Sequence, residues 1–188
     1  MSVLSIAGAL GFSPAKQGPC DIYEAAGTPC VAAHSLTRPL YAAYTGALYN
    51  VMRADNKTLD IGVGASGFAD AAAQDAFCGT SACTVHMIYD QSPQGNHLAV
   101  APPGGAAHHT DNECNATRSM ISISGHPVYA AVFEGGNGYR REKTTGIAVG
   151  DEPESMYAVF AGKHYNGGCC FDYVRDPGWH TCSHRTPA

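Results

Sequence analysis

The chain consists mostly of short apolar stretches that alternate with turns rich in Gly, Pro and Asn. Short runs of β-branched and aromatic residues between such turns are typical of strands. These runs predict strands over residues 47–53, 84–90, 97–101, 127–133 and 155–161. The turn over 91–96 joins two of them and predicts an antiparallel pair.

Only two segments have a helical pattern, and both are short. Residues 35–44 predict a helix with Pro39 near its first turn, where proline is tolerated. The Ala-rich residues 70–77 predict one or two further turns that end at Cys78. Neither is long enough for the crossover helices of a parallel sheet. The pattern therefore predicts an all-β protein, an antiparallel sandwich or jelly roll.

The composition fits one globular domain and excludes some partners. Of the 188 residues, 45% are hydrophobic and 14% are charged, and the net charge is −5. A chain of this length can bury a core of its own. There is no basic stripe of the kind that binding to phosphates needs, so nucleic acid is not an expected partner. Beyond the N-terminus, no apolar run has the length of a membrane span.

The N-terminus and the cysteine content indicate an extracellular protein. Residues 1–17 contain the apolar stretch 3–12 and predict a signal peptide, although the usual positive residues are missing. Eight cysteines favour an oxidising compartment. The sequence has no C-x-x-C pair, which argues against a zinc site. The sequons that begin at Asn56 and Asn115 permit glycosylation if the chain is secreted.

The spacing of the cysteines separates local pairs from an unusual one. Cys20 and Cys30 bracket nine residues, and Cys78 and Cys83 bracket four, as expected of disulfides that close short loops. Cys169 and Cys170 are adjacent. A bond between them would be strained, and it would offer a rigid, flat sulfur surface to the carbon face of a ligand. Spacing alone favours the alternatives, other pairings or buried thiols.

Several candidate motifs have simpler explanations. The glycines of residues 62–67 match G-x-G-x-x-G, but the expected surroundings fit a loop between strands better than a nucleotide site. The acidic residues 151–154 resemble a solvated loop more than a catalytic pair, with Asp90, Glu134 and Asp172 as other possible acids. The segment 108–113 contains two histidines and two acids, yet reads as a solvated loop, and we expect no metal.

A series of short blocks in one order resembles a known family. The blocks are residues 18–24, 28–35, 44–49, 69–78, 88–92, 95–98, 101–105, 138–140, 150–154, 156–159, 164–166 and 169–173. Together they resemble the catalytic domain of the fungal α-L-arabinofuranosidases of glycoside hydrolase family 54. The resemblance covers residues 18–173.

The resemblance implies a fold, an activity and a set of disulfides. It implies a concanavalin- or laminin-G-like antiparallel β-sandwich that releases terminal α-L-arabinofuranosyl groups from arabinoxylan and arabinan, with retention of configuration. It implies the pairs Cys20–Cys30, Cys78–Cys83 and Cys169–Cys170, the last lying against bound arabinose. It also implies a secreted monomer whose partner is an arabinose-containing plant polysaccharide, with no cofactor, metal or membrane.

The resemblance ends at Tyr173. Residues 174–188 show no likeness to the family, and Cys114 and Cys182 are unmatched. The family's nucleophilic Glu and acid/base Asp fall beyond the matching region, so neither has a position here. We hypothesise that an intron or frameshift follows Tyr173, which predicts an incomplete sandwich with open edges, inactive on its own. The alternatives are a non-catalytic arabinose-binding module or an inert fragment.

Overall fold

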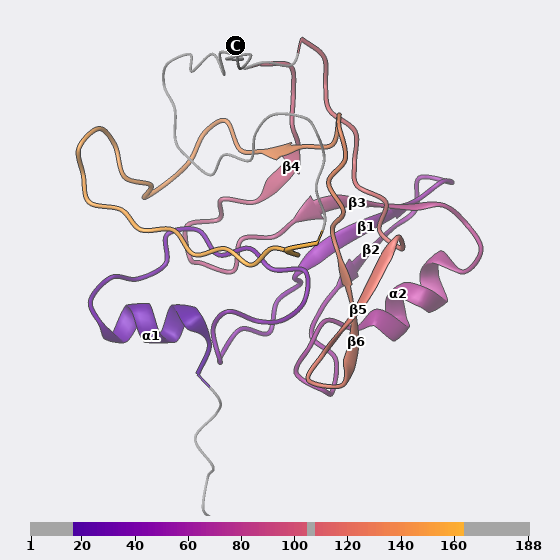
Figure 1. Ribbon diagram of the computed structural model, residues 1–188, viewed down its shortest axis with the longest axis horizontal. Helices are drawn as coiled ribbons and strands as arrows, with labels where there is room; N and C mark the ends of the chain where they lie inside the picture. Colours follow the sequence, from indigo (N-terminus) through magenta and orange to yellow (C-terminus); the bar gives the residue numbers. More distant parts are fainter. Residues whose placement is uncertain (1–16, 105–107, 164–188) are drawn as a thin grey trace, which may run out of the picture.

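The computed structural model describes residues 17–104 and 108–163 (Figure 1). Two short helices and seven strands follow one another along this part of the chain. They are α1 (Pro19–Ala25), β1 (Tyr49–Arg53), β2 (Thr58–Ile61), α2 (Ala71–Cys78), β3 (Cys83–Ile88), β4 (Leu98–Val100), β5 (Ser119–Ile123), β6 (His126–Ala130) and β7 (Tyr139–Arg140).

Five strands form one antiparallel sheet in the order β2-β1-β3-β4-β7, and β5 and β6 form a separate hairpin. Strand β1 lies between β2 and β3, and its Tyr49 is opposite Ile61 of β2 on one side and Ile88 of β3 on the other. The register of the pairing with β3 shifts between Asn50, which is opposite Met87, and Val51, which is opposite Val85. The all-β fold class, an antiparallel sandwich, is confirmed.

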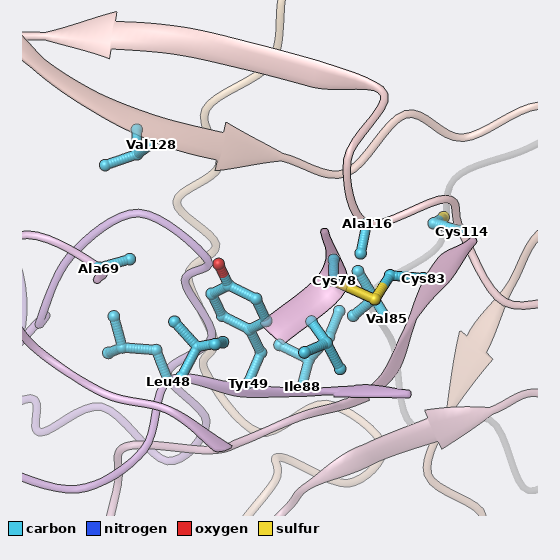
Figure 2. Close-up of a cluster of buried hydrophobic side chains, with 12 residues drawn as sticks. Leu48, Tyr49, Ala69, Cys78, Cys83, Val85, Ile88, Cys114, Ala116 and Val128 are labelled. Atoms are coloured by element: carbon cyan, nitrogen blue, oxygen red, sulfur yellow. A yellow bond between two sulfur atoms is a disulfide. The ribbon is translucent and has the colours of Figure 1, made fainter. Parts of the chain in front are cut away.

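The core lies between this sheet and a second layer made of α2 and the β5–β6 hairpin (Figure 1). Alternate residues of β1 and β3 point into it, as the two-residue period of a strand requires. Val51, Val85 and Val128 are at most 2% exposed. Figure 2 shows this cluster, with Tyr49 reaching from β1 toward the second layer.

A buried glutamine fastens the two layers. The hydroxyl of Tyr49 donates to Oε1 of Gln74 on α2 at 2.5 Å. The amide of Gln74 then donates to the carbonyl oxygen of Ala116 at 2.7 Å. Both Tyr49 and Gln74 are fully buried. Because each polar group has a partner, the core can hold them without the penalty of an unmade hydrogen bond.

Four of the five expected strands are present with slightly different ends. The predicted ranges 47–53, 84–90, 97–101 and 127–133 overlap β1, β3, β4 and β6, and β4 returns antiparallel to β3. The expected helix over 70–77 is α2, and Asp70 caps it by accepting from the backbone N–H of Ala73 at 3.0 Å.

The helix expected over residues 35–44 does not form. The hydroxyl of Ser35 accepts hydrogen bonds from the backbone N–H groups of Thr37 and Arg38, which makes a turn. The N–H of Leu40 donates to the side chain of Gln91 at 2.7 Å. Tertiary partners thus satisfy the backbone groups that a helix would have used, and the prediction of a helix was wrong.

The strand expected over residues 155–161 is also not formed. This segment pairs with no strand of the described part of the chain. Four of its large apolar side chains are 56–78% exposed: Met156, Tyr157, Val159 and Phe160. A strand needs a neighbour for its backbone groups, and the apolar pattern alone does not supply one.

Helix α1 and strands β2, β5 and β7 were not expected from the sequence. Pro19 begins α1, where its missing N–H and fixed φ do no harm. The Asp21 carboxylate accepts from the N–H of Gly18 at 2.6 Å and of Ala42 at 2.7 Å, which ties α1 to the following loop. Within residues 17–104 and 108–163, neither helix has the length and apolar character of a membrane span.

Candidate functional site

The residues that the sequence marks most strongly for ligand binding, Cys169 and Cys170, lie outside the described residues, as does Asp172. Two of the three implied disulfides are confirmed. Cys20 and Cys30 are bonded with their Cα atoms 5.5 Å apart, and Cys78 and Cys83 with theirs 5.9 Å apart. These bonds fasten α1 to its loop and α2 to β3, so they serve the scaffold.

Cys114, whose role the sequence left open, is a fully buried thiol in the core. Burial raises its pKa to about 11. A thiol that stays protonated is a poor nucleophile. Its backbone N–H donates to the hydroxyl of Tyr139 at 2.8 Å, and that hydroxyl donates to the carbonyl of Val85. Cys114 is therefore a packing residue.

Asp90, two residues after the end of β3, forms hydrogen bonds with both carboxylate oxygens. One carboxylate oxygen accepts from the backbone N–H groups of Ala33 at 2.7 Å and Ser92 at 2.9 Å. The other accepts from the hydroxyl of Ser92 at 2.7 Å and the N–H of Asn96 at 2.8 Å. The residue is 3% exposed. With both oxygens engaged, Asp90 organises the turn and does not present a reactive carboxylate.

The side chain of Asn96 extends this network to two other segments. Its amide N–H₂ donates to the carbonyl oxygens of Val31 at 2.9 Å and Thr145 at 2.8 Å. Its oxygen accepts from the N–H of Thr145 at 2.8 Å. Asn96 is 2% exposed, so these bonds are shielded from water. The turn after β3 thus fixes the loops before β1 and after β7.

Two histidines border the same network. Nε2 of His34 donates to the carbonyl oxygen of Asn96 at 2.8 Å, because a carbonyl can only accept. Nδ1 of His97 accepts from the backbone N–H of Asp90 at 2.9 Å, which fixes its proton on Nε2. Burial lowers the pKa of His34. The neutral imidazole of His34 is the form that this fold stabilises.

This lowered pKa predicts a loss of stability in mild acid. The unfolded chain binds a proton at His34 near the ordinary pKa of about 6.5, and the folded chain resists it. The free energy of unfolding should therefore fall as the pH drops from 7.5 to 5.5. In His34→Gln, whose amide can still donate to Asn96, the fall should be shallower. Urea unfolding at several pH values measures both slopes.

The exposed His109 offers a matched control, since its ring makes one hydrogen bond among the described residues, with the neighbouring Thr110 carbonyl. His109→Gln should keep the slope of the parent chain. Equal slopes in the parent, His34→Gln and His109→Gln would show that His34 does not cause the acid sensitivity.

A second polar group lies on the face of the sheet away from the core. Asp60 on β2 accepts from the amide of Asn50 at 2.7 Å and from the hydroxyl of Tyr89 at 2.8 Å. Burial and the hydrogen bond to Asp60 raise the pKa of Tyr89 to about 12, so its hydroxyl remains a donor. The amide oxygen of Asn50 is buried without a hydrogen-bond partner among the described residues.

A third polar group borders an open hollow of about 460 Å³. Glu113 binds the hydroxyl of Thr84 with one carboxylate oxygen and Nδ1 of His86 at 2.6 Å with the other. The hollow is lined by Met52, Arg53, Ala54, Asn56, Ala82, Thr84, Val100, Asp111, Asn112 and Glu113. It lies between the β1–β2 turn, the start of β3 and the loop before β5.

The other candidate acids and histidines do not converge. Within residues 17–104 and 108–163, no three His, Cys, Asp or Glu residues form a group that could hold a metal ion. The acidic residues 151–154 are exposed, and the Glu152 carboxylate accepts from the N–H of Val149. Glu134 forms an exposed ion pair with Arg118. These contacts fit the solvated loops expected from the sequence.

The glycine-rich residues 62–67 form a loop, as expected, but it joins strand β2 to helix α2 and not two strands. The N–H of Gly64 donates to Phe68, and the N–H of Gly67 donates back to Gly64. Gly67 has φ of 80°, which favours glycine. Strand β2 pairs only with the antiparallel β1, so the parallel βαβ unit of a nucleotide site is absent from this sheet.

With this geometry in view, comparison with known proteins identifies the family. Residues 19–177 match the family model "Alpha-L-arabinofuranosidase B, catalytic". The chain therefore belongs to the glycoside hydrolase family of α-L-arabinofuranosidase B catalytic domains.

Two curated relatives show how close the match is. The chain is 52% identical over 162 residues to α-L-arabinofuranosidase B of Aspergillus oryzae, which covers 83% of this chain and 32% of the relative. It is 52% identical over 161 residues to an α-L-arabinofuranosidase of Hypocrea jecorina, again covering 83% and 32%. The chain thus spans about a third of the length of these relatives.

Solved structures agree with the sequence match. One is an arabinofuranosidase complexed with arabinofuranosyl-α-1,2-xylobiose, 48% identical, with a TM-score of 0.68 over 72% of this chain and 30% of that one. Another is a Glu-to-Gln variant of a GH54 α-L-arabinofuranosidase soaked with 4-nitrophenyl α-L-arabinofuranoside, 47% identical, with the same TM-score and coverage. At 47–48% sequence identity, the similarity to these structures indicates a shared family and not only a shared fold.

Proposed function

We propose that this chain is the N-terminal part of a secreted, monomeric α-L-arabinofuranosidase catalytic domain that removes terminal arabinofuranosyl groups from arabinoxylan and arabinan with retention of configuration. The observation that carries the proposal is the family match over residues 19–177. A solved relative that aligns with 72% of this chain is complexed with an arabinofuranosyl xylobiose, which supports this class of substrate.

In this proposal the described residues support the site and Cys169 and Cys170 contact the sugar. The bond between these adjacent cysteines makes a rigid apolar surface for one face of arabinose. The network around Asp90 and Asn96 holds three loops in place with buried hydrogen bonds. Such a fixed scaffold favours catalysis, since reacting groups must be held close to their productive geometry.

The chemistry itself requires two further carboxyl groups. A retaining glycosidase uses a nucleophile and an acid/base about 5–5.5 Å apart. In the family that this chain resembles, the two catalytic carboxylates follow the adjacent cysteines. Residues 174–188 of this chain offer no position that matches either carboxylate. We therefore propose the activity for a protein in which this chain stands together with those two carboxylates, and we expect none from the 188 residues alone.

A chimera tests this proposal. Residues 19–173 of this chain replace the corresponding segment of the A. oryzae enzyme, and hydrolysis of 4-nitrophenyl α-L-arabinofuranoside is measured beside the parent enzyme and this chain alone. We expect a chimera with kcat/KM within about tenfold of its parent, a loss of under about 1.4 kcal/mol in transition-state binding. We expect the isolated chain to show no hydrolysis above background.

A soluble, folded chimera without hydrolysis would overturn the proposed function. Hydrolysis by the isolated chain would instead overturn the assignment of the missing carboxylates. An arabinose titration of the isolated chain separates the non-catalytic binding module from the inert fragment, because only the former binds the sugar.

A further inference from the structure

Asn56 is one of the residues that line the hollow beside β1 and β2, and it is also the first residue of a sequon. Asn56 occupies the turn of this hairpin with φ of 63°, where its backbone N–H donates to Arg53 at 2.8 Å. The residue is exposed, and its amide makes no hydrogen bond to the described residues. Its nitrogen is thus available for attachment of a glycan.

The rest of the sequon is equally open. Thr58 is exposed at the start of β2, directly across the ladder from Met52 on β1. Met52 in turn lines the hollow, so the sequon and the hollow share one hairpin. A sugar joined to Asn56 therefore begins at the lining of the hollow.

The lining of the hollow suits an amino sugar. Met52 and Val100 supply apolar surface, and Asp111 and Asn112 supply polar groups on the facing loop. N-acetylglucosamine has a carbon face for the first pair and hydroxyl and acetamide groups for the second. The volume of about 460 Å³ is within the range of about 300–1,000 Å³ that is usual for small-molecule sites.

We propose that Asn56 carries an N-linked glycan and that its first N-acetylglucosamine lies in this hollow, covering Met52 and Val100. The inference rests on the secretion included in the proposed function, because the glycan is added in the secretory pathway. The sugar is covalently attached to the same molecule and fills the hollow. The hollow therefore holds a glycan and does not bind a free ligand.

The second sequon provides an internal comparison. Asn115 is exposed, and its side-chain oxygen accepts from the N–H of Thr117 at 2.9 Å and from its hydroxyl at 3.2 Å. Asn115 does not line the hollow. A glycan there would not lie in this hollow, so we expect it to be attached without stabilising the fold.

The sequons should be removed at their threonines. A replacement for Asn56 would itself be strained at a positive φ, which asparagine tolerates better than most residues. Thr58→Val keeps the turn and suits a strand, and Thr117→Val is the matched control. Both variants and the parent chain are secreted from a filamentous fungus, and glycopeptide mass spectrometry reads the occupancy of each asparagine.

Thermal unfolding then distinguishes a sugar that lies in the hollow from one that is attached but does not pack against the protein. Thr58→Val should melt about 2–4 °C below the parent, the shift expected for a loss near 1 kcal/mol in a domain of this size. Thr117→Val should melt within about 1 °C of the parent. Endoglycosidase H leaves one N-acetylglucosamine on the parent chain, so this treatment should preserve its melting temperature. PNGase F removes the whole glycan and should lower the melting temperature by about as much as Thr58→Val does.

An Asn56 that is unmodified while Asn115 is occupied would overturn the inference and leave the proposed secretion intact. Equal melting temperatures of the parent and Thr58→Val would show that the sugar does not lie in the hollow. If neither asparagine is occupied, the proposed glycan is refuted, whereas hydrolysis by the chimera still tests the arabinofuranosidase independently.

Discussion

Replacement of Asp90 with alanine should lower the free energy of unfolding by about 3–5 kcal/mol, a large share of the stability of a single domain. The carboxylate accepts four hydrogen bonds, from Ala33, Ser92 and Asn96, in a position shielded from water. Alanine leaves these donors buried without an acceptor. Urea unfolding followed by circular dichroism should show a lower midpoint at an unchanged slope.

A graded pair of controls makes this result specific. Asp90→Asn keeps one acceptor oxygen, and the Ser92 hydroxyl can turn to accept from the new amide, so the loss should be about 2 kcal/mol. Asp151→Ala removes an exposed carboxylate and should change stability by less than about 0.5 kcal/mol. If Asp90→Ala unfolds at the midpoint of the Asp151→Ala protein, the network does not stabilise the fold.

This network could not be predicted from the sequence, although the strand that leads into it could. The β3–β4 pair follows from two apolar runs and a local turn, so neighbouring residues determine it. Asp90, by contrast, receives the N–H of Ala33 from 57 residues away. A single sequence does not reveal such distant partners, and in the sequence Asp90 looked like one more candidate acid.

The two wrong predictions share a cause. The segment 35–44 has helix-compatible residues, but Ser35 and Gln91 supply better partners for its backbone. The segment 155–161 has strand-like residues but no neighbouring strand among the described residues. In both cases local propensity was outweighed by where the backbone hydrogen bonds go. Helix α1 was missed for the converse reason, since contacts outside the helix hold it: Asp21 accepts from the N–H of Ala42, and Cys20 is bonded to Cys30.

The polar groups of the site were only partly visible in the sequence. The segment 108–113 drew notice as a possible metal site, yet Glu113 turns to Thr84 and His86 on β3, about thirty residues earlier in the chain. Cys20–Cys30 and Cys78–Cys83 were predictable as short-loop pairs, because ten and five positions separate their partners. The pairing of adjacent cysteines came from the family resemblance and stays a prediction.

The second large effect is expected at those adjacent cysteines. In the chimera, replacing both Cys169 and Cys170 with serine should lower kcat/KM by about ten- to thirtyfold. Serine would remove the proposed flat apolar sulfur surface and expose two hydrated hydroxyl groups to the sugar. Loss of about 60–80 Å² of apolar contact at about 25 cal/mol per Å² corresponds to roughly 1.5–2 kcal/mol, which gives a loss of that size.

Two matched variants separate contact from mere stability. Replacing both Cys169 and Cys170 with alanine keeps some apolar surface without the rigid ring, so kcat/KM should lie between the serine variant and the parent. Replacing Cys78 and Cys83 with serine opens a loop of the scaffold, and should lower the melting temperature while kcat/KM measured well below it stays near that of the parent. A serine variant at 169 and 170 that hydrolyses the substrate as fast as the parent chimera would show that arabinose does not rest on these sulfur atoms.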